Sequence, residues 1–167
     1  AGTPLVSDPG YRLVAAALEE GLRVVPIPGA SAVLAALTLS GLPSDSFLFA
    51  GFLPVKEGQR RTRLEALKNV PATLIFFESP RRLGASLASM AATLGPQRPA
   101  AVTRELTKTF EERRAGTLEE LARHYAEAGA PKGEAVVCVG PPLAQAAEAM
   151  DLDQLLLALA AEMPASK

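Results

Sequence analysis

The chain has 167 residues, a formal net charge of -1, 49% hydrophobic residues and no tryptophan. This length and apolar content allow one or two small domains with an aliphatic core, and they exclude an intrinsically disordered protein. The balanced charge excludes a general electrostatic argument for nucleic-acid binding, because domains that depend on phosphate contacts are usually basic.

The first ten residues, AGTPLVSDPG, predict a tight loop of the kind that binds ligands. Glycine and proline impose special backbone angles there, and small oxygen side chains bond to the main chain. The elements expected next are a helix over 11–20, a strand over 23–27, a turn at Pro28 and Gly29, and a helix over 31–39 with Ser31 as N-cap. Loop-forming residues over 41–46 then predict a domain boundary.

The second part of the chain also alternates between strand and helix patterns. Pro80 is expected at the first position of its helix, and Thr117 with Glu120 matches a capping box. The alternation predicts an α/β architecture with a mostly parallel or mixed sheet, and the tail 143–163 is helical by composition. Strands are expected over 47–52, 73–77, 100–104, 109–114 and 134–139, and helices over 57–68, 80–94 and 118–128.

Cysteine and histidine are scarce. Cys138 is the single cysteine and lies in an apolar run, so we expect a buried thiol and no internal disulfide. One cysteine and one histidine, His124, do not make an ordinary metal site, so we expect no metal. We find no signal peptide and no apolar run long enough to span a bilayer, and we therefore expect a cytoplasmic protein without membrane association.

Charged residues follow two of the expected strands. Glu78 comes directly after a dense apolar run, so its carboxylate must reach solvent or find a cation. A second cluster, over 103–108, lies at the end of another strand. Ligands of open α/β sheets bind at such edges, which favours one shared functional edge. In the alternative interpretation, Ser79 only caps the next helix, and the charged side chains form salt bridges or contact solvent.

Five segments occur in the order and spacing of a known family: AGTPLVSDPGYRLV, IPGASAVLAALTLSGLPSDSFLFAGFLP, FFESPRR, RELTKTFEE with the following RAGTLEEL, and GEAVVCVG. The chain thereby resembles the ribosomal RNA small subunit methyltransferase I family, within the tetrapyrrole methylase superfamily, from Ala1 to about Gly140. The family more often has ESPHR, so Arg81 stands where a histidine is usual, and no role of that histidine is transferred.

The resemblance implies transfer of a methyl group from S-adenosylmethionine to the ribose 2′-hydroxyl of a cytidine in small-subunit ribosomal RNA or the 30S subunit, by a homodimer. It implies that 1–45 are the remainder of an N-terminal cofactor-binding domain, that 46–142 form a C-terminal α/β domain with a mixed sheet, and that 143–167 form a helical tail. It also implies a fragment, truncated at both ends and inactive by itself.

The resemblance also places the candidate site residues. The expected cofactor-binding residues are Gly2, Thr3, Pro4, Gly29, Ser31 and Ala32. The catalytic candidates are Glu78, Arg104, Glu105 and Lys108, with Glu78 or Glu105 as proton acceptor. The expected RNA-binding residues are Arg60, Arg61, Arg63, Arg81 and Arg82.

Two other functions remain open. A precorrin or uroporphyrinogen methylase shares the implied fold and cofactor, and the balanced charge suits a small substrate, whereas ESPRR and RELTK match the RNA branch. A non-catalytic RNA-binding or scaffold domain is the third possibility. Calorimetry with S-adenosylmethionine tests this third possibility: micromolar binding would show that this chain holds the cofactor by itself, and we expect weak or no binding.

Overall fold

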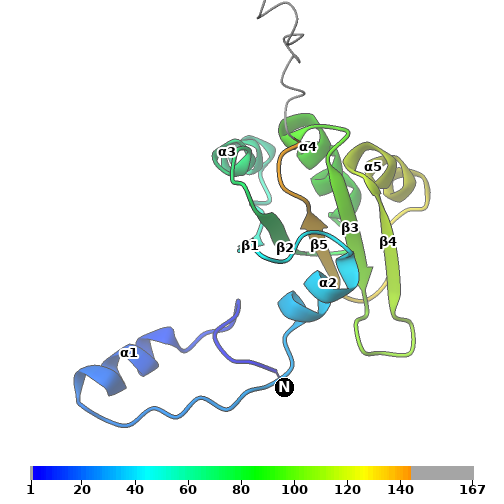
Figure 1. The fold of residues 1–167 in the computed structure, drawn as a ribbon. Helices are drawn as coiled ribbons and strands as arrows, with labels where there is room; N and C mark the ends of the chain where they lie inside the picture. The colour runs from blue at the N-terminus through cyan, green and yellow to red at the C-terminus, as the bar shows by residue number, and fades with distance from the viewer. Residues whose placement is uncertain (1, 144–167) are drawn as a thin grey trace, which may run out of the picture.

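A five-stranded mixed sheet forms the centre of the computed structural model, which describes residues 2–143 (Figure 1). The strands lie in the order β1-β2-β5-β3-β4. Strands β1 and β2 are parallel, and the other neighbouring pairs are antiparallel, which confirms the prediction of an α/β fold with a mixed sheet. The bounds are Phe47–Phe52 for β1, Thr73–Glu78 for β2, Pro99–Arg104 for β3, Glu112–Thr117 for β4 and Ala135–Val139 for β5.

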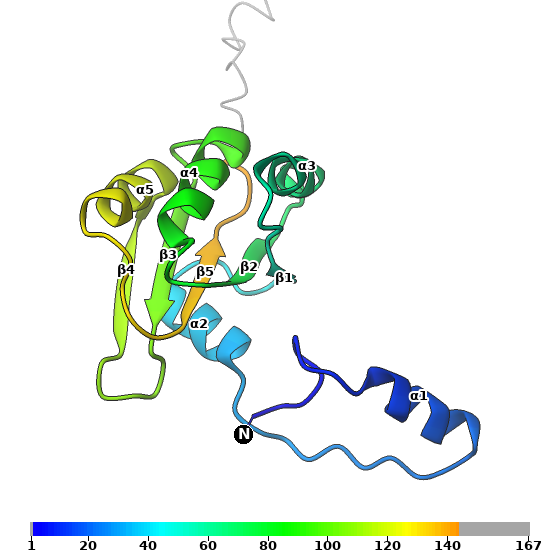
Figure 2. The same cartoon turned by 180° about the vertical axis from the view of Figure 1, so that it is seen from behind.

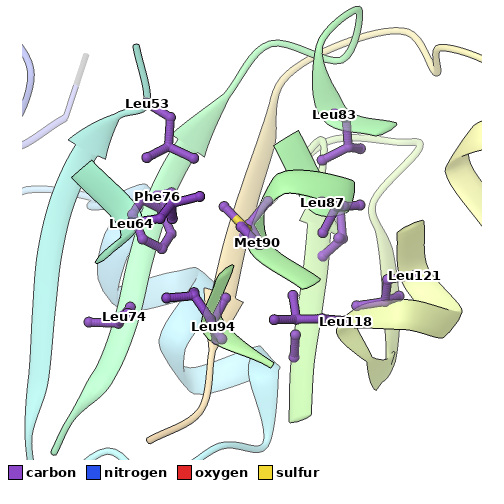
Figure 3. Close-up of a cluster of buried hydrophobic side chains, with 14 of the residues drawn as sticks. Leu53, Leu64, Leu74, Phe76, Leu83, Leu87, Met90, Leu94, Leu118 and Leu121 are labelled. Carbon is purple, nitrogen blue, oxygen red and sulfur yellow. The ribbon is translucent and has the colours of Figure 1, made fainter. Parts of the chain in front are cut away.

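Helices cover both faces of this sheet (Figure 2). The main core lies between one face and three helices, α3, α4 and α5, whereas α2 covers part of the other face. Figure 3 shows how Phe76 and Leu74 of β2 meet Met90 and Leu94 of α4. The helix bounds are Tyr11–Glu19 for α1, Ala32–Ser40 for α2, Glu57–Leu67 for α3, Leu83–Leu94 for α4 and Leu118–Glu127 for α5.

The central strands β2 and β5 are buried on both faces, which explains their continuous apolar sequences. Ile75 and Cys138 face α2, whereas Phe76 and Val137 face the other helices. The predicted capping box also forms: Thr117 Oγ1 accepts from the Glu120 backbone N–H at 3.2 Å, and Glu120 Oε2 accepts from the Thr117 N–H at 2.8 Å.

Three predicted elements differ from the structure. Residues 23–27 form no strand, because no other described segment pairs with them and their side chains are exposed. Helix α4 begins at Leu83 instead of Pro80, since a turn closed by the Arg82 N–H on the Ser79 carbonyl precedes it. Strand β4 begins at Glu112, because Arg104 pairs with Glu112 and the residues between them form the hairpin loop. Ser31 is the N-cap of α2 as predicted, but its side chain makes no capping hydrogen bond.

Helix α1 and the extended residues 22–30 stand apart from the sheet in both views, and the segment 2–31 buries none of its residues, although Val6 packs against the core on the α2 side of the sheet (Figures 1 and 2). Helix α2 behaves differently, because Val33, Ala36 and Leu37 are buried against the sheet. The expected unit 1–45 therefore contains a helix that packs with the unit 46–142. Apart from Leu143, the predicted helical tail 143–167 lies outside the described residues. No helix in the described part is long and apolar enough to cross a membrane.

Candidate functional site

Two loops that are far apart in the sequence meet beside the sheet. The Thr3 backbone N–H donates to the Ala30 carbonyl at 2.7 Å, and Thr3 Oγ1 donates to the Gly29 carbonyl at 2.9 Å. The approach requires glycine on both sides, since a Cβ on Gly2 would lie 2.5 Å from the Ala30 oxygen and one on Gly29 would lie 3.3 Å from the Thr3 nitrogen. These hydrogen bonds hold together the two loops that are expected to bind the cofactor.

A pocket of about 260 Å³ opens next to these loops, at the end of β2 and the start of β5. Its walls are mainly apolar. Ala32, one of its lining residues, comes directly after the loop that contains Gly29. The rings of Phe52 and Phe77 lie edge to face, with centroids 5.7 Å apart. The lining includes Ala32, Phe52, Phe77, Pro80, Gly133 and Val136. A larger cavity, about 560 Å³, lies beside Arg98 and contains none of the predicted site residues.

Glu78 reaches this pocket from the end of β2, but its carboxylate is enclosed and fully engaged. The side chain is 0% exposed, and Oε1 lies 2.6 Å from Arg82 Nη2. The Ser79 N–H donates to Oε1 at 2.7 Å, and the Ser86 hydroxyl donates to Oε2 at 2.6 Å. Three donors engage this carboxylate and its side chain is 0% exposed, so a substrate proton cannot reach it readily, and the geometry favours a role in holding the turn 79–82.

The second predicted cluster is at the same edge of the sheet, because Glu78 and Arg104 both pair with Ala135 of β5. Arg104 binds Glu112 through Nε and Nη2, at 3.1 and 2.8 Å, and Nη1 donates to the Lys132 carbonyl at 2.9 Å. These bonds connect the β3–β4 hairpin to the loop 129–134. The structure thus confirms the predicted juxtaposition of the two charged clusters.

Lys108 bridges Glu105 at 2.9 Å and Glu134 at 3.0 Å. The Lys108 hydrogen bond, together with one from the Glu134 N–H, lowers the pKa of Glu105 below its ordinary value. The same ion pairs raise the pKa of Lys108. Glu105 is therefore a weaker base than an ordinary glutamate, and both groups stay charged near neutral pH.

Strained backbone marks two of these loops. Glu105 and Thr107 have φ values of 50° and 65°, and Leu5 and Ser7 have values of 72° and 56°. Non-glycine residues rarely adopt this left-handed region, and such residues concentrate at ligand-binding sites. The two strained loops are the hairpin loop of the second charged cluster and the loop that contacts Gly29.

The five arginines of the predicted RNA surface have different surroundings. Arg60 is 8% exposed, and its guanidinium donates to the Ser89 hydroxyl at 2.9 Å and the Val55 carbonyl at 3.0 Å. Arg82 is engaged by Glu78 and by the Leu53 carbonyl. Arg61, Arg63 and Arg81 are exposed. Arg60 and Arg82 thus bind other residues of this protein, and the remaining three arginines are exposed to solvent.

Sequence reasoning missed several residues of this site. Phe52 and Phe77 form the aromatic wall, and Gly133 lies where a Cβ would overlap the Glu105 carboxylate. The exposed fraction of Phe52, 56%, is unusual for a phenylalanine at a strand end, but it becomes visible only in the folded chain. The sequence contains a weak indication of a functional loop at Gly133, because this glycine lies between two charged residues, Lys132 and Glu134, just before a strand.

Comparison with known proteins identifies the family. Residues 1–122 match the family described as Tetrapyrrole (Corrin/Porphyrin) Methylases. The chain belongs to this family. A relative from Mesorhizobium japonicum, named Ribosomal RNA small subunit methyltransferase I, is 74% identical over 167 residues, which are 100% of this chain and 57% of the relative. A relative of the same name from Pseudomonas aeruginosa is 48% identical over 174 residues, with 100% of this chain and 61% of the relative covered.

Solved structures show the same fold. Uroporphyrin-III C-methyltransferase from Thermus thermophilus, complexed with S-adenosyl homocysteine, superposes with a TM-score of 0.55 at 22% identity, over 82% of this chain and 62% of that one. A diphthine synthase superposes with a TM-score of 0.60 at 17% identity, over 83% and 57%. The chain spans 57% and 61% of the length of the two relatives named above.

Proposed function

We propose that this chain forms part of a methyltransferase that transfers a methyl group from S-adenosylmethionine to the ribose 2′-hydroxyl of a cytidine in small-subunit ribosomal RNA. The observation that carries this proposal is the 74% identity, over the whole chain, to a relative named Ribosomal RNA small subunit methyltransferase I. The described residues support it with two joined glycine loops beside an apolar pocket at the sheet edge. The proposed partners are ribosomal RNA, the 30S subunit and a second copy of the chain, in the cytoplasm.

The two joined loops and the pocket suit different parts of S-adenosylmethionine. Gly2 and Thr3 contact Gly29 and Ala30, and glycine in both loops lets backbone groups approach a small ligand closely, whereas Ala32 is the expected cofactor-binding residue that lines the pocket. The apolar walls of Phe52, Phe77 and Val136 suit a flat ring. When bound, the cofactor supplies a methyl group that is already activated on a sulfonium. The chain contributes orientation and exclusion of water.

Positioning is the main task that we assign to the charged residues. Holding two reactants in line supplies about 7–11 kcal/mol, whereas a general base adds about 10²–10⁴-fold in rate. Glu78 holds the turn 79–82, and Arg104 joins the hairpin to the loop 129–134. The engaged oxygens of Glu78 and the lowered pKa of Glu105 make each a poor proton acceptor. We therefore propose Glu78, Arg104, Glu105 and Lys108 as residues that position the acceptor ribose.

Mapping of ribose methylation tests this function. Small-subunit RNA is prepared from cells with and without the gene that encodes this chain, and 2′-O-methyl groups are mapped along it. We expect one cytidine to lose its methyl group and to regain it when the gene is restored. An unchanged map contradicts the proposal, and methylation of a tetrapyrrole by the same protein would support the small-substrate alternative.

A further inference from the structure

The pocket continues into a groove on the outside of the molecule. The turn 79–82 and the loop 129–134 form its first part, about 420 Å³, which shares Ser79, Pro80 and Gly133 with the pocket. The groove then runs between α4 and α5 as a second part of about 360 Å³, which shares Pro80 and Arg81 with the first. Any chain that leaves the pocket by this route passes between Arg81 and Lys132.

Small side chains form the outer part of the groove. Gly84, Ala85 and Ala88 come from α4, and Ala126 and Ala130 come from α5 and the loop that follows it. The two helices approach closely here, since a Cβ on Gly84 would lie 3.2 Å from the Tyr125 carbonyl oxygen. A surface without long side chains leaves room for a backbone to lie along it.

Two exposed cations flank the inner part of the groove. Arg81 comes from the turn and Lys132 from the opposite loop, and both side chains are without an ion pair or hydrogen bond to any other residue of the described chain. Of the neighbouring carboxylates, Glu78 pairs with Arg82 and Glu112 with Arg104, whereas Glu105 and Glu134 share Lys108 and keep one net negative charge between them. No carboxylate of the described residues pairs with Arg81 or Lys132, so both side chains at the mouth of the pocket are free to bind an anion.

We propose that this groove binds the single-stranded RNA backbone next to the methylated nucleotide, with phosphates at Arg81 and Lys132. The inference rests on the proposed function, because it needs an acceptor ribose at the mouth of the pocket, beside the cofactor. A nucleotide held there stays joined to its neighbours, so their phosphates lie near the two cations that flank the mouth. Charge complementarity and continuity with the pocket both favour this occupant. The arginine at position 81 supplies a charge that persists at all physiological pH values.

RNA binding by the 167-residue chain tests the groove. The probe is a fluorescein-labelled, single-stranded fragment of small-subunit RNA, and fluorescence anisotropy measures its affinity between about 50 and 200 mM salt. Each phosphate contact to a single strand contributes about 0.7 to the slope of log K against log salt concentration. We expect the double variant Arg81→Ala with Lys132→Ala to lower the magnitude of that slope by about 1.4. The loss of affinity between the lowest and the highest salt concentration should then be roughly sevenfold smaller than for the unaltered chain.

Arg23→Ala together with Lys68→Ala is the matched control, because both side chains are exposed, neither lines the groove, and one arginine and one lysine are lost as in the test variant. We expect the control to leave the slope unchanged. An unchanged slope in the double variant overturns the inference, as does an absence of RNA binding by the unaltered chain at the lowest salt concentration. If the double variant leaves the slope unchanged but cells without the gene lack the methyl group on one cytidine, only the groove is refuted. If the methylation map is the same with and without the gene, the proposed function itself is refuted.

Discussion

At the scale of single residues, Glu78 is the group on which the local structure depends most. Its carboxylate, which is itself shielded from solvent, accepts from the Ser79 N–H and the Ser86 hydroxyl and pairs with the partly exposed Arg82. A buried carboxylate is tolerated only with such partners. Removal of the carboxylate leaves three donors without an acceptor, and one of them is charged.

We therefore expect Glu78→Ala to lower the free energy of unfolding by about 3 kcal/mol. Ser86→Ala removes one donor to a charged group and should cost about 1.5 kcal/mol. Urea denaturation with an unchanged m-value measures both. The control is Glu65→Ala on the exposed surface of α3, for which we expect almost no change. If Glu78→Ala costs no more than Ser86→Ala, the carboxylate is not the anchor of this turn.

At the scale of elements, the β3–β4 hairpin and the loop 129–134 behave as one unit. Lys108 connects them through Glu105 and Glu134, and the Glu134 N–H donates to Glu105 Oε1 at 2.9 Å. Gly133 permits this contact, because its φ is 94° and a Cβ would overlap the Glu105 carboxylate. Gly129, at the other end of the loop, has a φ of 75° and open space around it.

These two glycines form a matched pair for a test. Both Gly129→Ala and Gly133→Ala place a side chain in the left-handed region, which costs about 1 kcal/mol. We expect Gly133→Ala to be the more destabilising, because it also displaces Glu105. The free energies of unfolding are measured again in a Glu105→Ala background, where the difference between the two substitutions should shrink. A difference that survives there would mean that Glu105 is not the cause.

The elements that could be predicted from sequence are those with local signals. Strands β2 and β5 have dense apolar runs, and α5 begins with a capping box. Residues 23–27 have an equally apolar pattern, but a strand forms only with a partner, and no single segment reveals whether one is present. The two charged clusters could be assigned to one edge of the sheet because each of them follows an expected strand in the sequence. The burial of Arg60 depends on Ser89, 29 residues away, which local patterns do not reveal. The oxygens of Glu78 are engaged by nearby residues, but only the folded turn 79–82 and the start of α4 bring Arg82 and Ser86 onto them.

At the scale of the whole molecule, Cys138 reports on cooperative unfolding. The thiol is 0% exposed in the central strand, and burial raises its pKa from an ordinary 9.0 to about 12. We expect labelling by a thiol reagent to require global opening of the sheet, at a rate that follows the unfolding equilibrium. Labelling that is fast under strongly native conditions would contradict this expectation.

The same thiol gives a pH dependence. Its folded pKa is raised, so its contribution to stability is complete below about pH 9.0 and is lost as the pH rises toward about 12. The comparison is with Cys138→Ala, which lacks the ionisable group. We expect the difference in unfolding free energy between the two proteins to change in this alkaline range and to stay constant between about pH 6 and 8.

The position of β5 has a consequence for the order of folding. Among the strands of residues 2–143, β5 is the last to be synthesised, yet it lies between β2 and β3 and contributes to both core clusters. During synthesis, β1 can pair with β2 and β3 can pair with β4, but the two pairs have no common partner until residues 135–139 are available. Until then, the nascent chain exposes two unpaired strand edges, and edges of this kind invite aggregation. The five-stranded sheet therefore cannot be completed before residues 135–139 are available.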